Sequence, residues 1–556
     1  MSSSPLGRRP AMEPLAPRLA HEPGRPGPAR ARLAACMGFS ACAIFTGACA
    51  ILAGCAVGPD YHTPDIPLPA HLAASSAPAP AMGGKAPGAA TAGAPAPNLA
   101  SWWCALRDPE LNSLVQQAIT DNPDVQIALD RLQAARTYEA ALIGTVLPDA
   151  EGSAGAGWGT GTDLTRGRAA QSLIAADDTT GLEHINTIGG FDSVWELDVF
   201  GKYRREMQAA HFDTQSLAAA RDGVLVGVIA DVAQAYIDLR GTQARAAVLE
   251  ANIAVLRESQ RIVHIRFQRG ITNELDVTLA DRELADLSAQ LAPMQAQVNA
   301  GKYAIATLLG RFPEQLVGEL KPAMVPATPQ LSPAALPLDL LRQRPDIREV
   351  ERELGAATAR IGVATGDLFP DLAVTAAVGF QKQGLNTDPA VGQHIWSAGP
   401  SVLWPLLDFG TLDAQVDIAD LRTRELLIAY RHTIQAAVQD VDTQVESYAA
   451  EQSRLQQLGD ALVASQRAVE LAQQRYDRGL TDFLNVVDAE RQAFVIQDEY
   501  AVAQTVAADE FVSLYRSLGG GWQSFQKLPD IRRPQPAIIA IFRRLLTRDD
   551  PLKSPM

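Results

Sequence analysis

The chain has 556 residues, enough for several hydrophobic cores, and a formal net charge of −15. This acidic balance, without a basic stripe in the body of the chain, argues against a nucleic-acid-binding protein. The eight His and five Cys show no metal-ligand spacing and no disulfide framework, so the sequence gives a metalloenzyme little support.

The first 54 residues have the layout of a signal peptide: a long Pro- and Arg-rich stretch, an apolar run over 33–53, and small residues at its end. The run ends in Leu52-Ala-Gly-Cys55, which resembles the lipobox of bacterial lipoproteins and implies a lipid such as palmitate on Cys55. A plain membrane-anchor helix is the alternative, since about 20 apolar residues can span a bilayer. We favour the lipoprotein, because small residues directly precede the Cys and polar sequence follows at once.

Residues 55–100 are expected to form the lipid anchor and a linker. The stretch 70–98 consists almost wholly of Ala, Pro, Gly and Ser, and such a composition cannot build a core. Ordered sequence resumes at Ser101-Trp-Trp103, and the pattern over 111–143 predicts helix with a break at Asn122-Pro123.

An internal repeat organises the rest of the chain. The stretch Arg269-Gly270-Ile-Thr-Asn recurs as Arg478-Gly479-Leu-Thr-Asp, 209 positions later (479 − 270). Pro-Asp pairs at both ends of an earlier helical segment recur 222 positions apart (345 − 123), so the first copy carries 13 extra residues (222 − 209). We place these in the Gly-rich loop between 159 and 190. The copies are expected to span 101–321 and 322–525, with a basic, Pro-broken tail over 526–556.

Each copy contains a predicted β-hairpin, at about 148–200 and about 370–409. In the second copy, apolar residues alternate with smaller or polar ones, at Leu372, Val374, Ala376, Val378 and Phe380. Strands of about 10 residues with one apolar face can cross a membrane, and aromatic residues near their ends suit its interfaces. Hairpins packed on a soluble core are the alternative.

Long helical patterns follow the hairpins. Apolar residues at alternating steps of three and four predict a coiled-coil helix over 204–269 and a second one that ends at Gly479. Helices are expected to return over 272–309 and 481–518. Gly270 and Gly479 thus lie at the tips of two predicted helical hairpins.

Four strands per chain cannot close a transmembrane barrel, and an open sheet edge is not tolerated in lipid. If the hairpins cross a membrane, the chain must oligomerise, and three copies would supply about 12 strands. The long helices of the three copies would then form a hollow cylinder. The predicted fold class is therefore mainly α with a small transmembrane β part.

These marks, in this order, resemble the outer-membrane factor (TolC-like) family, in its lipoprotein efflux branch (NodT-type) that works with resistance-nodulation-division (RND) pumps. They cover nearly all of residues 55–525, and the Ala/Pro linker and the basic tail depart from the family pattern. The marks are Cys55-Ala-Val-Gly-Pro-Asp-Tyr61, Trp102-Trp103, Asp108-Pro-Glu-Leu111, Asn122-Pro-Asp124, Arg344-Pro-Asp346, Phe369-Pro370, Phe409-Gly410, the two Arg-Gly turns and the segment Leu514–Trp522.

The resemblance implies a homotrimer with a 12-stranded β-barrel in the outer membrane and an α-barrel in the periplasm. It implies a passive, lipid-anchored duct that exports small molecules such as drugs. Such a duct is not an enzyme and needs no cofactor besides the covalent lipid on Cys55. The implied partners are a periplasmic membrane-fusion adaptor, an inner-membrane RND-type pump and outer-membrane lipid, but no nucleic acid.

The resemblance also implies roles for residues at the tips. The implied periplasmic gate residues are Leu484, Asp488, Leu275 and Asp276. The implied adaptor contacts are Arg269, Gly270, Arg478 and Gly479. Each set has a structural alternative. Asp488 is favoured near a helix N-terminus by the dipole alone, Leu484 suits a helix core, and the glycines suit the turn itself.

Other functions stay open at this point. A conduit for protein secretion is the main alternative, and a periplasmic coiled-coil scaffold lipoprotein without a pore is another. An enzyme has almost no support, because Gly155-Ala-Gly-Trp-Gly-Thr-Gly161 lacks Gly at position 160 and lies in a predicted strand.

Overall fold

The computed structural model describes residues 56–67, 98–160, 183–329, 338–385 and 391–525. The predicted signal peptide, Cys55, most of the Ala/Pro linker, much of the inserted loop and the basic tail lie outside these residues. The chain divides into two units, Met1–Cys55 and Ala56–Met556, and all described residues belong to the second.

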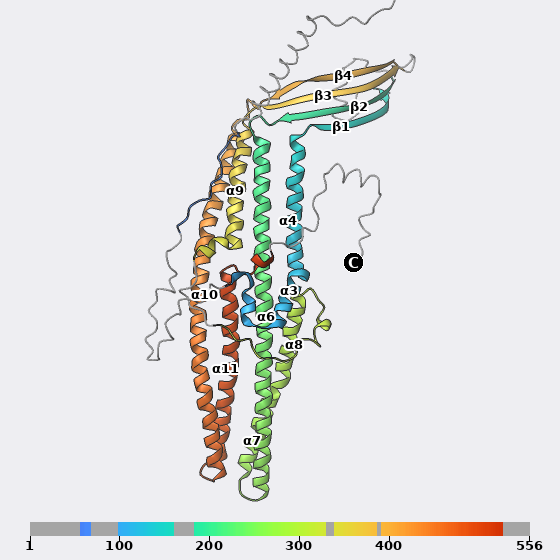
Figure 1. Ribbon diagram of the computed structural model, residues 1–556. Helices are drawn as coiled ribbons and strands as arrows, with labels where there is room; N and C mark the ends of the chain where they lie inside the picture. Colours follow the sequence, from blue (N-terminus) through green and yellow to red (C-terminus); the bar gives the residue numbers. More distant parts are fainter. Residues whose placement is uncertain (1–55, 68–97, 161–182, 330–337, 386–390, 526–556) are drawn as a thin grey trace, which may run out of the picture. The chain divides into compact units, whose positions relative to one another are not determined.

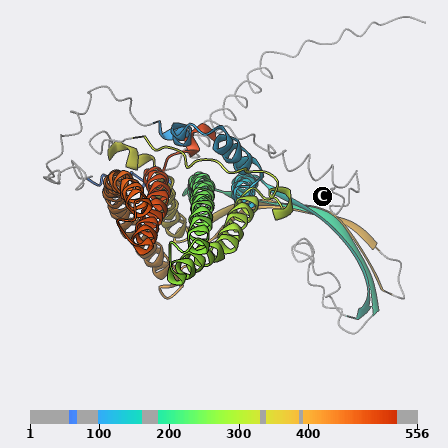
Figure 2. The ribbon, with the colours of Figure 1, turned by 90° about the horizontal axis from the view of Figure 1, so that it is seen from below.

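Two helices of equal length carry the two repeats. α6 (Lys202–Gln268) and α10 (Thr411–Asp477) each have 67 residues, about 100 Å at 1.5 Å per residue. α10 pairs with α11 (Phe483–Ser517), which also packs on α6 (Figure 1; Figure 2). Both long helices follow a strand at their N-terminal ends and reach a turn at their C-terminal ends, so both turns lie far from the sheet (Figure 1).

The helix that returns from α6 differs from the prediction. The sequence predicts one helix over 272–309, but the structure has two, α7 (Glu274–Ala289) and α8 (Leu291–Leu308), which meet at Gln290. Pro293 accounts for the break, because its nitrogen cannot donate a helical hydrogen bond and its ring clashes with the carbonyl four residues earlier, at Ala289, the last residue of α7. α11 contains no proline and runs unbroken.

Shorter helices flank the long ones. The predicted break at Asn122 is confirmed: its side chain accepts bonds from the N–H groups of Asp124 and Val125 and donates to the carbonyl of Leu308 at 2.7 Å. These shorter helices are η1 (Leu99–Leu106), α3 (Pro109–Asp121), α4 (Pro123–Leu142), η2 (Ile143–Val146), η3 (Pro313–Gln315), η5 (Leu338–Gln343), α9 (Pro345–Gly366) and η6 (Trp522–Phe525).

The four described strands form one antiparallel sheet in the order β1-β2-β3-β4. β2 of the first repeat pairs with β3 of the second, from His184↔Leu385 to Leu197↔Leu372. β1 and β4 are therefore the two edges of this sheet. The strands are 12 to 15 residues long, which exceeds the predicted length; they are β1 (Asp149–Thr160), β2 (Glu183–Leu197), β3 (Asp371–Leu385) and β4 (Val391–Leu403).

The largest core lies around α6, α11 and the helices that precede β1. Trp102 of η1 stacks on Tyr515 of α11 at 5.5 Å, and apolar residues of α3, α6 and α10 surround them. Arg240 of α6 is fully buried there and donates to Glu110 and to the hydroxyl of Tyr236, so its charge is compensated. Among the described residues, no helix combines the length and the hydrophobicity needed to span a bilayer.

Residues 56–67, called the strap here, run along α9 and α10. The N–H of Val57 donates to the carbonyl of Phe200 at 3.0 Å, close to the start of α6. The nearly buried Arg205 donates to the carbonyl of Val57 at 3.0 Å and pairs with Asp60 at 2.9 Å. The strap is therefore a fitted part of the fold, although its sequence has no helical or strand period.

Candidate functional site

The two turns at the helix tips share one backbone geometry. Gly270 and Gly479 have φ values of 68° and 64°. In each turn the glycine N–H donates to the carbonyl three residues back, and the next N–H donates to the carbonyl five residues back, all at 2.8 to 2.9 Å. Nothing lies within 4 Å of a Cβ added at either position, so the backbone conformation, and not space, requires glycine.

The helices that leave the two turns start differently. The side chain of Asn273 accepts a bond from the N–H of Asp276 at 3.0 Å and caps α7. The hydroxyl of Thr272 also donates to the carboxylate of Asp276. At the second turn, Asp482 makes no side-chain cap bond, and the Asn485 amide donates to a nearby threonine hydroxyl at 2.8 Å instead. The first turn is thus tied by more of its own side chains than the second.

A small apolar core, called the tip core here, joins the two hairpins beside the turns. Tyr476 is only 7% exposed, and its ring centroid lies 5.4 Å from that of Phe483 and 4.3 Å from the Arg266 guanidinium. Burial raises the pKa of Tyr476 against the charge of Arg266, and the carboxylate of Asp276 raises it further. The charge of Asp276 thus acts on a residue of the second hairpin. The members of the tip core are Val263, Ala280, Tyr476, Phe483, Val486 and Val487.

The predicted gate residues occupy two different settings. Leu484 and Asp488 lie four residues apart on one face of α11, and both are exposed. The interpretation of Leu484 as a core residue is wrong for this chain, because its side chain is 57% exposed. Leu275 is exposed as well, whereas Asp276 is half-buried and bonded. Of the two acidic residues, Asp276 is thus bonded within its own turn, whereas Asp488 has no side-chain bond to the described part of the chain.

The predicted adaptor contacts all lie at the surface of the turns. Arg269 and Arg478 are the C-cap residues of α6 and α10, where a positive charge complements the helix dipole. Both arginines, Gly270 and Gly479 are exposed. Cys55, the predicted lipidation site, lies outside the described residues.

One buried carboxyl group near the tips was missed by the reading of the sequence. Glu490 of α11 lies inside the bundle, where the hydroxyl of Ser259 donates to one of its oxygens at 3.2 Å. Its other oxygen is buried without a hydrogen-bond partner among the described residues. Burial raises the pKa of Glu490, and the charge of Glu283 on α7 raises it further. The sequence does indicate this burial, because Glu490 lies on the same helical face as the apolar residues Val486, Val487 and Ala493.

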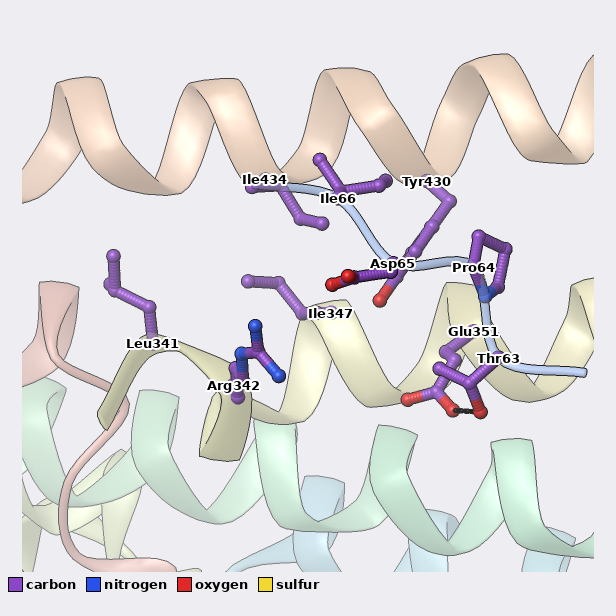
Figure 3. A pocket seen from close by; sticks show the side chains of 10 residues that line it. All are labelled: Thr63, Pro64, Asp65, Ile66, Leu341, Arg342, Ile347, Glu351, Tyr430 and Ile434. Atoms are coloured by element: carbon purple, nitrogen blue, oxygen red, sulfur yellow. Dashed lines mark hydrogen bonds between the residues drawn. The ribbon is translucent and has the colours of Figure 1, made fainter. Parts of the chain in front are cut away.

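A pocket between the strap and helices α9 and α10 is too small for a drug-sized ligand. Figure 3 shows Thr63 bonded to Glu351, with Tyr430 and Ile434 of α10 nearby. The pocket holds about 100 Å³, whereas small-molecule sites need about 300–1,000 Å³. Across the part of the chain that the structure describes, no three His, Cys, Asp or Glu residues are grouped to hold a metal ion.

Comparison with known proteins agrees with this architecture. The family model described as "Outer membrane efflux protein" matches residues 114–311 and 336–520. The chain is 28% identical to Nodulation protein T of Rhizobium leguminosarum bv. trifolii, over 86% of this chain and 97% of that protein. It is 30% identical to the solvent efflux pump outer membrane protein SrpC of Pseudomonas putida, again over 86% of this chain and 97% of the relative.

A solved structure is similar as well. The outer-membrane channel OprN is 33% identical with a TM-score of 0.71, over 84% of this chain and 100% of that one. The resemblance noted in the sequence is thereby confirmed. The chain belongs to the outer membrane efflux protein family, and its place is the outer membrane.

Proposed function

We propose that three copies of this chain form the outer-membrane duct of a tripartite efflux system, which exports small molecules passively. The observation that carries the proposal is the four-stranded sheet, which has one exposed apolar face and two unpaired edges. In water, a single copy would expose the apolar face. In lipid, the backbone groups of its two edges would stay unpaired, so neither environment suits a single copy.

The apolar face follows from the register of the strands. Phe191, Val378 and Trp396 lie side by side across β2, β3 and β4. Their exposed fractions are 69%, 57% and 78%. At the helix end of the sheet, the indole N–H groups of Trp195 and Trp404 donate to backbone carbonyls at 3.0 and 3.2 Å. An exposed apolar band with tryptophans at its margin suits the acyl region of a bilayer and its interface.

Three copies would join their edges into a barrel of about 12 strands, above the smallest barrels of about eight. The long helices would continue this ring as a hollow α-barrel. A lipid on Cys55 would anchor each copy in the same membrane, because Cys55 directly precedes the strap. No cofactor is needed for passive export.

The exposed pair on α11 is the proposed gate. Leu484 and Asp488 of three copies would meet around the axis at the tips, as rings of leucine and aspartate that narrow the duct and favour cations. Leu275 and Asp276 of the first hairpin would support the gate from its rim. The exposed turns at Arg269, Gly270, Arg478 and Gly479 would meet a periplasmic membrane-fusion adaptor, which connects the duct to an RND-type pump.

The class of exported molecule comes from the relatives. SrpC is named as part of a solvent efflux pump, and TtgC of Pseudomonas putida as part of a toluene efflux pump. Small apolar compounds are therefore the proposed cargo of this chain as well.

Conductance across a planar bilayer tests the proposal. The purified protein should form a low-conductance closed channel, and Leu484→Ser with Asp488→Ala should raise the conductance severalfold. Leu480→Ser is a matched control, because Leu480 is exposed at the same turn but lies before α11. A protein that conducts in neither form contradicts the duct.

A further inference from the structure

Polar side chains recur at seven-residue spacing on one face of α6 and bond across to α11 of the second repeat. In one pair a guanidinium meets a carboxylate, in the next an amide meets an amide, and in the third a hydroxyl meets a carboxyl group. The pairs are Arg245 with Asp498 at 2.7 Å, Asn252 with Gln497 at 2.7 Å, and Ser259 with Glu490 at 3.2 Å. Of these three pairs, the one nearest the tips thus gives its carboxyl group no opposite charge.

Ser259 and Glu490 belong to a polar layer between two apolar clusters. The tip core lies on one side of this layer, and the cluster around Leu256 and Leu287 lies on the other. α6, α7 and α11 each place one polar residue between apolar neighbours three or four positions away, on one helical face. These sets are Leu256, Ser259 and Val263 on α6, Ala280, Glu283 and Leu287 on α7, and Val487, Glu490 and Phe494 on α11.

The layer leaves the carboxyl group of Glu490 poorly compensated. Ser259 and Glu490 are only 6% and 8% exposed. Glu283 has the Arg282 guanidinium at 3.3 Å. Glu490 has the hydroxyl of Ser259 on one oxygen, and its other oxygen is buried without a partner among the described residues. An ionised carboxylate is costly in such a place, because it has lost water and gained one neutral donor.

The charges around Glu490 favour its protonated form as well. In the described part of the chain, α6 and α10 place no charged group that acts on it, and α7 places the like charge of Glu283. Burial raises the pKa of Glu490 above the ordinary 4.5, the charge of Glu283 raises it further, and the Ser259 hydroxyl lowers it. A bound proton removes the charge and makes the carboxyl group a donor.

The first repeat holds an acid at the equivalent position, in the opposite environment. Asp281 lies 209 positions before Glu490 and is exposed. One of its oxygens accepts a bond from Gln260 at 2.8 Å and lies 3.0 Å from Nε2 of His264. These two partners lower the pKa of Asp281. The uncompensated acid is therefore specific to α11, the helix that carries the proposed gate.

We propose that Glu490 is a proton-linked latch, which holds α11 against α6 and α7 while it carries a proton and loosens this packing when it ionises. When α11 moves away, the carboxyl group returns to water and releases its proton there. The latch therefore contributes fully below pH 4.5 and is lost as the pH rises towards the raised value. The consequence for export rests on the proposed duct: Leu484 and Asp488 move with α11, so the gate should open more readily at alkaline pH.

Hydrogen exchange at the first turns of α11 tests the latch. Glu490→Gln keeps the size and the bonding capacity of the protonated acid but cannot ionise. The full chain in detergent is measured at pH 5 and pH 8, and each variant is compared with the parent protein at the same pH. Glu490→Gln should slow the exchange severalfold at pH 8 and change it little at pH 5. Asp281→Asn is the matched control and should give no protection at pH 8.

The neighbours of Glu490 provide a test that a purely structural role would not pass. Ser259→Ala removes the donor that favours the carboxylate, so the parent's loss of protection should move to higher pH. Glu283→Gln removes the like charge and should move the loss to lower pH. Shifts in the same direction, or no shift in either variant, overturn the latch.

The outcomes separate the latch from the duct. Equal exchange of Glu490→Gln and the parent at both pH values overturns the latch and leaves the duct. If calcium chloride protects α11 of the parent at pH 8 but not α11 of Glu490→Gln, a cation and not a proton occupies the layer, which also overturns the latch. A protein that never conducts in a planar bilayer overturns the duct alone. A conductance that rises from pH 5 to pH 8 in the parent, and less in Glu490→Gln, supports both.

Discussion

α6 and α10 have the same length and the same turn, yet they differ in how much of them is buried. In α6, 25 residues are buried, and they extend from Arg205 to Val263. In α10 only seven are buried, with none between Tyr448 and Tyr476. The two repeats therefore share the backbone of the long helix but differ in how far its side chains are buried. α6 is packed on both sides by other helices of the chain, whereas one face of α10 stays exposed.

The two tips differ in what holds them in place. The first turn is held by its own side chains, through Asn273, Thr272 and Asp276. The second turn lacks a side-chain cap but supplies most of the tip core, through Tyr476 and α11. The first tip is therefore fixed locally, and the second is fixed by its packing on the first.

The largest expected effect tests this dependence. Tyr476→Ala should destabilise the tip core by about 3 kcal/mol, because it removes a buried aromatic ring and leaves a cavity. Phe267→Ala is the control, since Phe267 is the equivalent residue of the first repeat but is 41% exposed. Hydrogen exchange at the start of α11 should quicken in the first variant only. Equal effects of the two substitutions would show that the tips are held alike.

A smaller effect concerns the contact between α6 and α11. Burial raises the pKa of Asp509 to about 8, and the facing carboxyl of Asp238 adds to the shift. Below the ordinary pKa of 3.8, Asp509 is protonated in the folded and in the unfolded chain and does not lower stability. Because the folded-state pKa is raised, the free energy of unfolding falls as the pH rises from 3.8 to about 8. Asp509→Asn should therefore stabilise the fold by about 2 kcal/mol at pH 9 and little at pH 4.

Thermal melting at the two pH values measures this difference. Asp488→Asn is the matched control, because it removes an exposed carboxylate from the same helix. If Asp509→Asn and the parent protein melt at the same temperature at both pH values, the carboxyl groups of Asp238 and Asp509 are not buried against each other in solution.

The smallest expected effect separates the two turns. Asn273→Ala should cost about 1 kcal/mol, because it removes a side-chain cap bond. Asp482→Ala should change the free energy of unfolding by only a few tenths of that, since Asp482 makes no cap bond. Protease sensitivity of each turn is the measurement. If Asp482→Ala lowers stability more than Asn273→Ala does, the second turn, and not the first, is held by its own side chains.

Much of the fold was predictable, because local chemistry specifies it. The glycine turns, the break at Asn122 and the alternating face of β3 depend on residues close in sequence. The break at Gln290 was missed, although Pro293 signals it, because the surrounding pattern is uniformly helical. The membership of the family followed from the order of many short motifs, and the comparisons confirm it.

The site was less predictable, because it depends on contacts between distant residues. Arg266 and Tyr476 come from different repeats, and neither sequence segment indicates the other. The strap has no periodicity, and its place is set by Arg205, which lies 148 residues from Val57. Leu484 and Asp488 are exposed, whereas Asp276 is half-buried. The spacing of these residues in the sequence does not predict this difference.

The equal length of α6 and α10 has a mechanical consequence. A rigid rod of about 100 Å that tilts by about 2° at one end moves its far end by about 3.5 Å. That displacement is comparable with the 4.3 Å between the Arg266 guanidinium and the Tyr476 ring centroid, whereas the bonds inside the turn of α10 move with the helix and stay intact. A tilt of α10 against α6 that is too small to disturb the strands would therefore separate the two hairpins at the tip core.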